Sequence, residues 1–116
     1  MQRDPDKWLE DILTAGNDAL EFLDGKTQND YVTNKALRAM VERKLYIVGE
    51  AVTQLKKEFP EVAQGLPDVR DIVRFRNFLA HGYFALDHRR VFDIATASLP
   101  SLLIAVGIAI DDHEKP

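Results

Sequence analysis

The chain has 116 residues, of which 46% are hydrophobic and 29% are charged, and this composition fits one globular domain and excludes a disordered or fibrous chain. It contains no cysteine, which excludes disulfides and thiolate metal sites. The net charge of −4 argues against a generally basic nucleic-acid-binding surface, although residues 68–90 carry five arginines against three aspartates, hence +2, which leaves −6 for the remainder.

Helical periodicity begins near the N-terminus, whereas strand patterns are nearly absent from the whole sequence. The first expected helix runs from about Asp4 to Asp24, with Pro5 in its first turn and Gly25 as its stop signal. The apolar residues that recur on one face of this helix are Leu9, Leu13, Gly16, Leu20 and Leu23.

The second expected helix ends near Glu58, because Pro60 follows it. Its start is open between Gln28 and Asn34, since residues 27–30 resemble a capping box and a break is expected shortly afterwards, near residue 33. Its apolar stripe consists of Leu37, Val41, Val48, Val52, Leu55 and Phe59. Its three regularly spaced glutamates are interpreted as a solvated stripe, and they are Glu42, Glu50 and Glu58.

Residues 61–65 are expected to form either a plain connector or one helical turn, and they lead to a third expected helix over about 66–80. A fourth is expected over about 87–110, kinked at Pro100 and followed by a frayed, charged tail at residues 111–116 in which His113 is idle. Four helices with short connections predict an all-α chain folded as an antiparallel up-and-down four-helix bundle.

Neither a leader nor a membrane anchor is predicted. The N-terminus is polar and leads into an amphipathic stretch rather than the apolar core of a signal peptide. The longest apolar run, residues 99–110, is too short to span a bilayer. We therefore expect a single domain over residues 1–116, located in the cytoplasm and without membrane association.

The third expected helix carries the residues best suited to chemistry. One of its faces is polar or basic throughout, and it consists of Arg70, Arg74, Asn77 and His81. The plain alternative is that this is simply the solvent-exposed face. Asparagine and histidine nevertheless favour a functional interpretation, because these residue types hold and activate a phosphodiester.

Arg76 lies off that face. It precedes His81 by five residues, which is about 140° around an ideal helix. Either the helix breaks near His81, or the arginine and the histidine that act together come from two chains, as they do in a dimeric site. Tyr83 follows Arg76 by seven residues, so these two side chains can lie on one side.

The segment Arg76–Tyr83 reads R-N-x3-H-x-Y and resembles the signature of HepT-like toxins in the HEPN superfamily of ribonucleases. The resemblance extends to Gly-Glu-Ala at residues 49–51, to the Pro-x-x-x-Asp-Ile approach at 67–72 and to Leu-Pro-x-Leu at 99–102. It therefore covers most of the chain. Val69 is a departure, since family members often carry tryptophan there.

The resemblance implies a HEPN-like homodimer that acts as a metal-independent endoribonuclease without a cofactor, on RNA such as transfer RNA or messenger RNA. Arg76 is then expected to stabilise the phosphorane, His81 to act as general base or acid, and Asn77 to orient His81. Attack by the 2′-hydroxyl leaves a 2′,3′-cyclic phosphate, so DNA is expected to resist cleavage.

The resemblance also implies a toxin–antitoxin system, in which a nucleotidyltransferase antitoxin transfers AMP to Tyr83 and silences the toxin. The alternative for Tyr83 is a tyrosine that caps the core with its hydroxyl in solvent. Further RNA-binding candidates are basic, and they are Arg70, Arg74, His88, Arg89 and Arg90.

Two other functions remain open at this point. One is a non-catalytic HEPN accessory subunit that binds substrate for a nucleotidyltransferase, and the other is a plain dimeric helical interaction module. The complete set of arginine, asparagine, histidine and tyrosine favours catalysis, because a binding module does not require all four.

Overall fold

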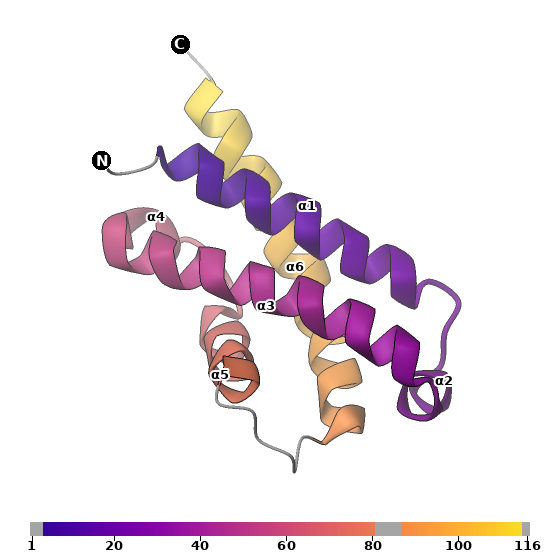
Figure 1. Cartoon of the computed structure of the whole chain (residues 1–116). Helices are drawn as coiled ribbons and strands as arrows, with labels where there is room; N and C mark the ends of the chain where they lie inside the picture. The colour runs from indigo at the N-terminus through magenta and orange to yellow at the C-terminus, as the bar shows by residue number, and fades with distance from the viewer. Residues whose placement is uncertain (1–3, 81–86, 115–116) are drawn as a thin grey trace.

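The computed structural model describes residues 4–80 and 87–114, and all regular structure in these residues is helical. The prediction of an all-helical chain is therefore confirmed for the described part of the chain. Figure 1 shows the helices in chain order, and they are α1 (Pro5–Leu23), α2 (Gln28–Thr33), α3 (Lys35–Glu58), α4 (Pro60–Gln64), α5 (Val69–Ala80) and α6 (His88–Glu114).

A capping side chain starts α1, and a glycine with positive φ follows its end. The Asp4 carboxylate accepts the backbone N–H of Asp6 at 2.9 Å, and Pro5 occupies the first turn, where its missing N–H costs nothing. Gly25 follows α1 with a φ of +73°, a conformation that glycine adopts without steric cost. The predicted first helix is confirmed at both ends.

The junction between α2 and α3 resolves the open start of the second predicted helix. Thr27 and Asp30 form a capping box: the Thr27 hydroxyl accepts the Asp30 N–H at 3.1 Å, and the Asp30 carboxylate accepts the Thr27 N–H at 2.9 Å. These hydrogen bonds hold the pKa of Asp30 below its ordinary value. Asn34 then caps α3 by accepting the Leu37 N–H at 3.0 Å. A helix therefore begins at each of the two predicted starts: α2 begins at Gln28, and α3 begins directly after Asn34.

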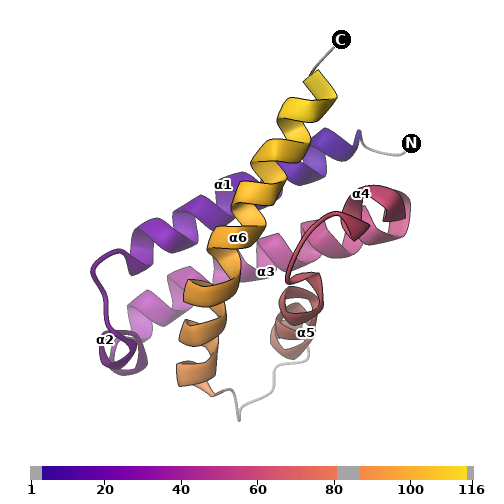
Figure 2. The same ribbon diagram turned by 180° about the vertical axis from the view of Figure 1, so that it is seen from behind.

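Helices α1 and α3 lie side by side and antiparallel (Figure 1). The Trp8 indole near the start of α1 donates to Glu58 at the end of α3 at 2.7 Å, and Asp18 pairs with Lys44 at 3.0 Å. Helix α6 crosses this pair, as Figure 2 shows from behind, and its end returns to the start of α1.

The core fills the space between these helices. Among the described residues, its members come from each of the helices α1 to α6 and from the α4–α5 connection, and most are aliphatic. The largest side chains that are fully buried are Tyr31, Leu9, Ile12, Leu45, Leu55, Ile72, Leu99, Leu102, Val41, Val48, Val52 and Val91.

Helix α6 is longer and more apolar than the sequence pattern predicted. With 27 residues and an 18-residue window of mean hydropathy 1.9, it is long and apolar enough to cross a membrane by length and composition, a test that core helices also pass. One side of it packs into the core, while Ile104 and Ile108 are 67% and 56% exposed and add to its hydropathy. We interpret α6 as a core helix.

The frayed tail predicted for residues 111–116 is wrong for residues 111–114, because α6 continues to Glu114. His113, which was expected to be idle, lies with its Nδ1 2.5 Å from a carboxylate oxygen of Asp6. This contact joins the last turn of α6 to the first turn of α1.

The start of α5 is fixed by a residue in a strained conformation. Asp68 has a φ of +61°, which residues other than glycine rarely adopt, and its carbonyl accepts the Ile72 N–H at 3.2 Å, in the first turn of the helix. Its carboxylate accepts the Ser101 hydroxyl of α6 at 2.8 Å. The helix that carries Arg76 is thereby anchored to α6.

Candidate active site

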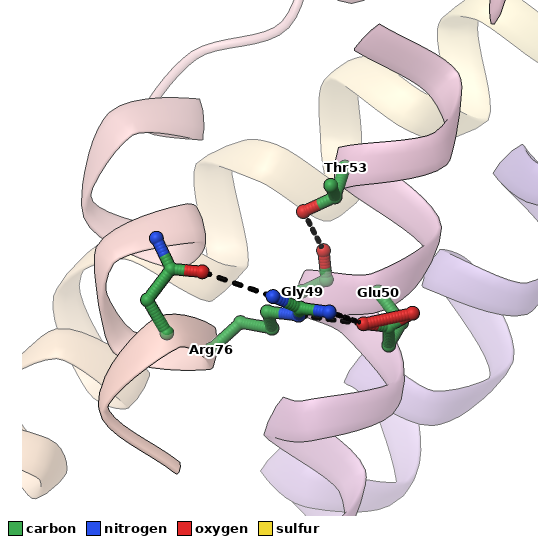
Figure 3. Close-up of polar contacts among 5 residues, drawn as sticks. Gly49, Glu50, Thr53 and Arg76 are labelled. Carbon is green, nitrogen blue, oxygen red and sulfur yellow. Dashed lines mark hydrogen bonds and ion pairs between the residues drawn. The ribbon is translucent and has the colours of Figure 1, made fainter. Parts of the chain in front are cut away.

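Helices α3 and α5 approach each other closely where Gly49 faces Arg76. A Cβ on Gly49 would overlap the Cβ and Cγ atoms of Arg76, so no larger residue fits there without moving one helix. The Gly49 carbonyl also accepts the Thr53 hydroxyl at 2.7 Å, within α3 (Figure 3). The absence of a side chain at Gly49 thus sets how deeply Arg76 sits against α3.

The Arg76 guanidinium lies in a network of polar contacts across this crossing. Its Nε donates to Oε1 of Glu50 at 2.6 Å, and its Nη2 also contacts this oxygen (Figure 3). Its Nη1 donates to the side-chain oxygen of Asn77 at 3.0 Å. The Arg76 and Glu50 side chains are 25% and 32% exposed, so the ion pair is half-buried and remains partly accessible to solvent.

An aromatic ring adds to the surroundings of Arg76. The Arg76 Cζ atom lies 5.9 Å from the centre of the Tyr46 ring, one turn before Glu50 in α3. An arginine at this distance over a tyrosine face is stabilised by the ring's quadrupole. Residues of α3, namely Tyr46, Gly49 and Glu50, therefore form the floor on which this arginine of α5 is held.

The predicted polar face of α5 is exposed. Arg70, Arg74 and Asn77 all face solvent, while Ile72 and Phe75 of the same helix are buried. This arrangement fits both an RNA-binding surface and an idle solvent face, so the RNA-binding role of Arg70 and Arg74 stays a prediction. His81 and Tyr83 lie outside the described residues, and with them the predicted contact of Asn77 with His81.

His88 turns inward, away from the exposed side chains that follow it. Its Nδ1 lies 3.9 Å from a carboxylate oxygen of Glu42 in α3, and its ring meets the Tyr31 ring edge-on, 6.5 Å between centres. The buried Nδ1 of His88 and the buried hydroxyl of Tyr31 have no hydrogen-bond partner among the described residues. His88 therefore joins α6 to α2 and α3, and its predicted RNA-binding role stays a prediction.

Arg89 and Arg90 are exposed in the first turn of α6. Their backbone N–H groups point to the side chain of Asp87, which accepts them at 3.1 and 3.4 Å and caps the helix. The two guanidinium groups thus project from the start of the helix that follows the motif. Their assignment to RNA binding stays a prediction.

The interpretation of the three glutamates of α3 as a solvated stripe is wrong. Glu42 lies by His88, Glu50 holds Arg76 and Glu58 accepts from Trp8. Burial raises the pKa of the Glu42 carboxyl, opposed by the nearby His88 and Arg38. Burial, with the Glu42 charge, also raises the pKa of Tyr31. Glu50, the partner of Arg76, is the candidate site residue that the sequence pattern missed.

Comparison with known proteins places this site in a family. The family model described as "Ribonuclease HepT-like" matches residues 12–107. A Methanocaldococcus jannaschii protein named "Putative RNase" is 34% identical over 101 residues, which is 87% of this chain and 92% of the relative. Another from the same organism is 30% identical over 114 residues, 98% of this chain and 97% of the relative.

A third relative, from Thermococcus cleftensis, is named "Probable ribonuclease HepT". It is 31% identical over 102 residues, which is 88% of this chain and 92% of the relative. No solved structure matches the chain. Since the matched region contains the α3–α5 crossing and the whole R-N-x3-H-x-Y segment, the chain belongs to the HepT-like ribonuclease family of the HEPN superfamily.

Proposed function

We propose that this protein is a metal-independent endoribonuclease, the toxin of a toxin–antitoxin system in the cytoplasm. The observation that carries the proposal is the half-buried Arg76, held by Glu50 and Asn77 at the start of the R-N-x3-H-x-Y segment. An arginine fixed in this way is suited to hold a phosphate, because its planar fork binds two oxygens at once. The names of the relatives support RNA as the substrate.

The proposed reaction uses the RNA's own nucleophile. His81 takes the proton of a 2′-hydroxyl, and the 2′-oxygen attacks the adjacent phosphorus. Arg76 stabilises the charge that builds up on the phosphorane oxygens. The bond from phosphorus to the 5′-oxygen then breaks, the 5′-oxygen takes up a proton, and the products are a 2′,3′-cyclic phosphate and a 5′-hydroxyl.

The proposed working unit is a homodimer of up-and-down four-helix bundles, with both motifs at the interface. A second chain supplies the geometry that one helix lacks, since Arg76 and His81 are about 140° apart around an ideal helix. The proposed regulation is transfer of AMP to the Tyr83 hydroxyl by a nucleotidyltransferase antitoxin. The added nucleotide fills the site and repels RNA through its phosphate.

The first experiment incubates the purified chain with total RNA in EDTA, beside its His81→Ala variant. Mass spectrometry first establishes that Tyr83 carries no AMP. We expect cleavage by the wild type alone, with ends that carry a 2′,3′-cyclic phosphate. Equal cleavage by both proteins points to a contaminant, and cleavage by neither favours the accessory-subunit function, in which the same residues hold RNA or nucleotide without cutting it.

A further inference from the structure

The contacts of Arg76 leave a defined part of its guanidinium free. An arginine has five N–H donors. Glu50 takes one from Nε and one from Nη2, and Asn77 takes one from Nη1. One N–H on each Nη atom thus remains without a partner among the described residues. A bidentate contact with two phosphate oxygens uses one N–H on each Nη, on the edge that the two Nη atoms share.

The Glu50 contact fixes the direction in which the free N–H groups of Nη1 and Nη2 point. It joins two helices whose separation is set by the close approach at Gly49, so neither end of the ion pair can shift along its helix without cost. One carboxylate oxygen accepts hydrogen bonds from both Nε and Nη2, which are the two nitrogens on one edge of the guanidinium. Rotation of the guanidinium breaks at least one of these hydrogen bonds.

We infer that Glu50 is a positioning residue, which turns the Arg76 guanidinium so that its free Nη1 and Nη2 donors face an RNA phosphate. The inference rests on the proposed function, and it adds a residue of α3 to a site otherwise carried by α5 and the segment after it. Glu50 acts through Arg76 and does not itself touch the reacting atoms.

Two other roles for Glu50 make different predictions. If Glu50 screens Arg76 and competes with phosphate, its removal raises RNA affinity and activity. If Glu50 only stabilises the packing of α3 against α5, its removal lowers the stability of the fold and leaves kcat and KM of the folded protein unchanged. A positioning role lowers kcat while KM stays the same or falls, because the misdirected arginine fails in the transition state and a negative charge has left the RNA-binding region.

The test compares Glu50→Gln, Glu50→Asp, Arg76→Lys and the double variant Glu50→Gln/Arg76→Lys with the wild type. Glu21→Gln is the matched control, since it removes the same charge from an exposed position on α1. The steady-state kcat and KM are measured on a short RNA in EDTA. The Nε–Hε resonance of Arg76, identified by its absence in Arg76→Lys, reports how well this group is held whether or not RNA is cut.

We expect kcat to fall about 10- to 100-fold in both Glu50 variants, with KM unchanged or lower, and to stay at the wild-type value in Glu21→Gln. Aspartate fails because it is one methylene too short to span the crossing. The Nε–Hε proton exchanges faster with water in Glu50→Gln than in the wild type. The double variant is no slower than Arg76→Lys, since Glu50 acts through Arg76.

A wild-type or higher kcat in Glu50→Gln overturns the inference, as does an additive loss in the double variant. If the wild type cuts no RNA, the proposed function is what fails, and the inference is decided by binding to RNA and by the resonance. The inference then survives only if two results are found. The Arg76→Lys substitution must weaken RNA binding less in the Glu50→Gln chain than in the wild-type chain, and the Nε–Hε proton of Arg76 must lose its protection from exchange in Glu50→Gln.

Discussion

At the scale of single residues, the site depends on angular spacing along α3. Eight residues advance a helix by two turns and about 80°, so residues spaced by eight point in three different directions. Glu42, Glu50 and Glu58 accordingly meet α6, α5 and α1 in turn. The sequence shows the spacing, but it does not show which helix lies in each direction, so the spacing alone suggests a solvated stripe.

Gly49 provides the sharpest test of the crossing. In Gly49→Ala the new methyl group overlaps the Arg76 side chain, so we expect a loss of about 1–3 kcal/mol in the free energy of unfolding, together with loss of RNA cleavage. The measurement is urea denaturation followed by circular dichroism.

Gly107→Ala is the matched control, because it places the same methyl group inside a helix with nothing within 4 Å of it. We expect this variant to gain about 0.5–1 kcal/mol from its higher helix propensity. If Gly49→Ala is as stable and active as Gly107→Ala, the two helices do not need the close approach at Arg76.

At the scale of elements, local chemistry predicted most helix ends and long-range contacts decided the rest. The capping residues Asp4, Thr27 and Asn34 start their helices as the sequence indicated. The predicted end of α6 is wrong because a charged terminal segment, considered without its contacts, indicates a frayed helix end. Its helical state goes with a contact between His113 and Asp6, 107 positions apart, which no local pattern reveals.

The junction of α2, α3 and α6 gives a prediction about pH. Folding raises the pKa of Glu42, so the folded chain binds this proton more readily than the unfolded chain does, and ionised Glu42 lowers stability as the pH rises above the ordinary value of 4.5. The groups that face it are His88 of α6, Arg38 of α3 and Tyr31 of α2. Glu42→Gln removes the ionised form.

We therefore expect Glu42→Gln to unfold at a higher temperature than the wild type at pH 8, with the difference shrinking as the pH falls towards 4.5. Thermal melts at intervals across this range measure it, and Glu21→Gln controls for the loss of one charge. A difference that is the same at both ends of the range contradicts the assigned burial of Glu42.

At the scale of the whole molecule, the sequence predicts the all-helical fold and the family, but it does not predict that Glu50 holds Arg76. The segment Arg76–Tyr83 indicates the HepT-like family, and the family model that matches residues 12–107 confirms it. The pairing of Arg76 with Glu50 spans 26 positions and depends on two helices crossing at a glycine. Glycine at residue 49 was visible in the sequence, but only the packed structure shows which residue fills the space.

The proposed dimer predicts complementation between two inactive chains. If the arginine and histidine of one site come from different chains, a mixed dimer of Arg76→Ala and His81→Ala has one intact site. Equal mixing after unfolding and refolding should then restore about a quarter of the wild-type activity, since about half of the dimers are mixed and each has one of two sites. Cleavage of labelled RNA measures it, and each variant refolded alone is the control.

Failure of the mixture to recover activity places both residues of a site in one chain. Light scattering decides whether a dimer forms at all, because the chain has a mass of 13.2 kDa and the predicted particle has twice that mass.

The crossing of α6 over α1 and α3 also bears on how the protein is made. Helix α6, which covers the first pair, follows the other described helices, so a nascent chain whose α6 is still inside the ribosome exposes the apolar sides of α1 and α3 and lacks the Ser101 anchor of α5. The hydrogen bond that anchors the start of α5, the helix of Arg76, to α6 therefore forms only after α6 has left the ribosome.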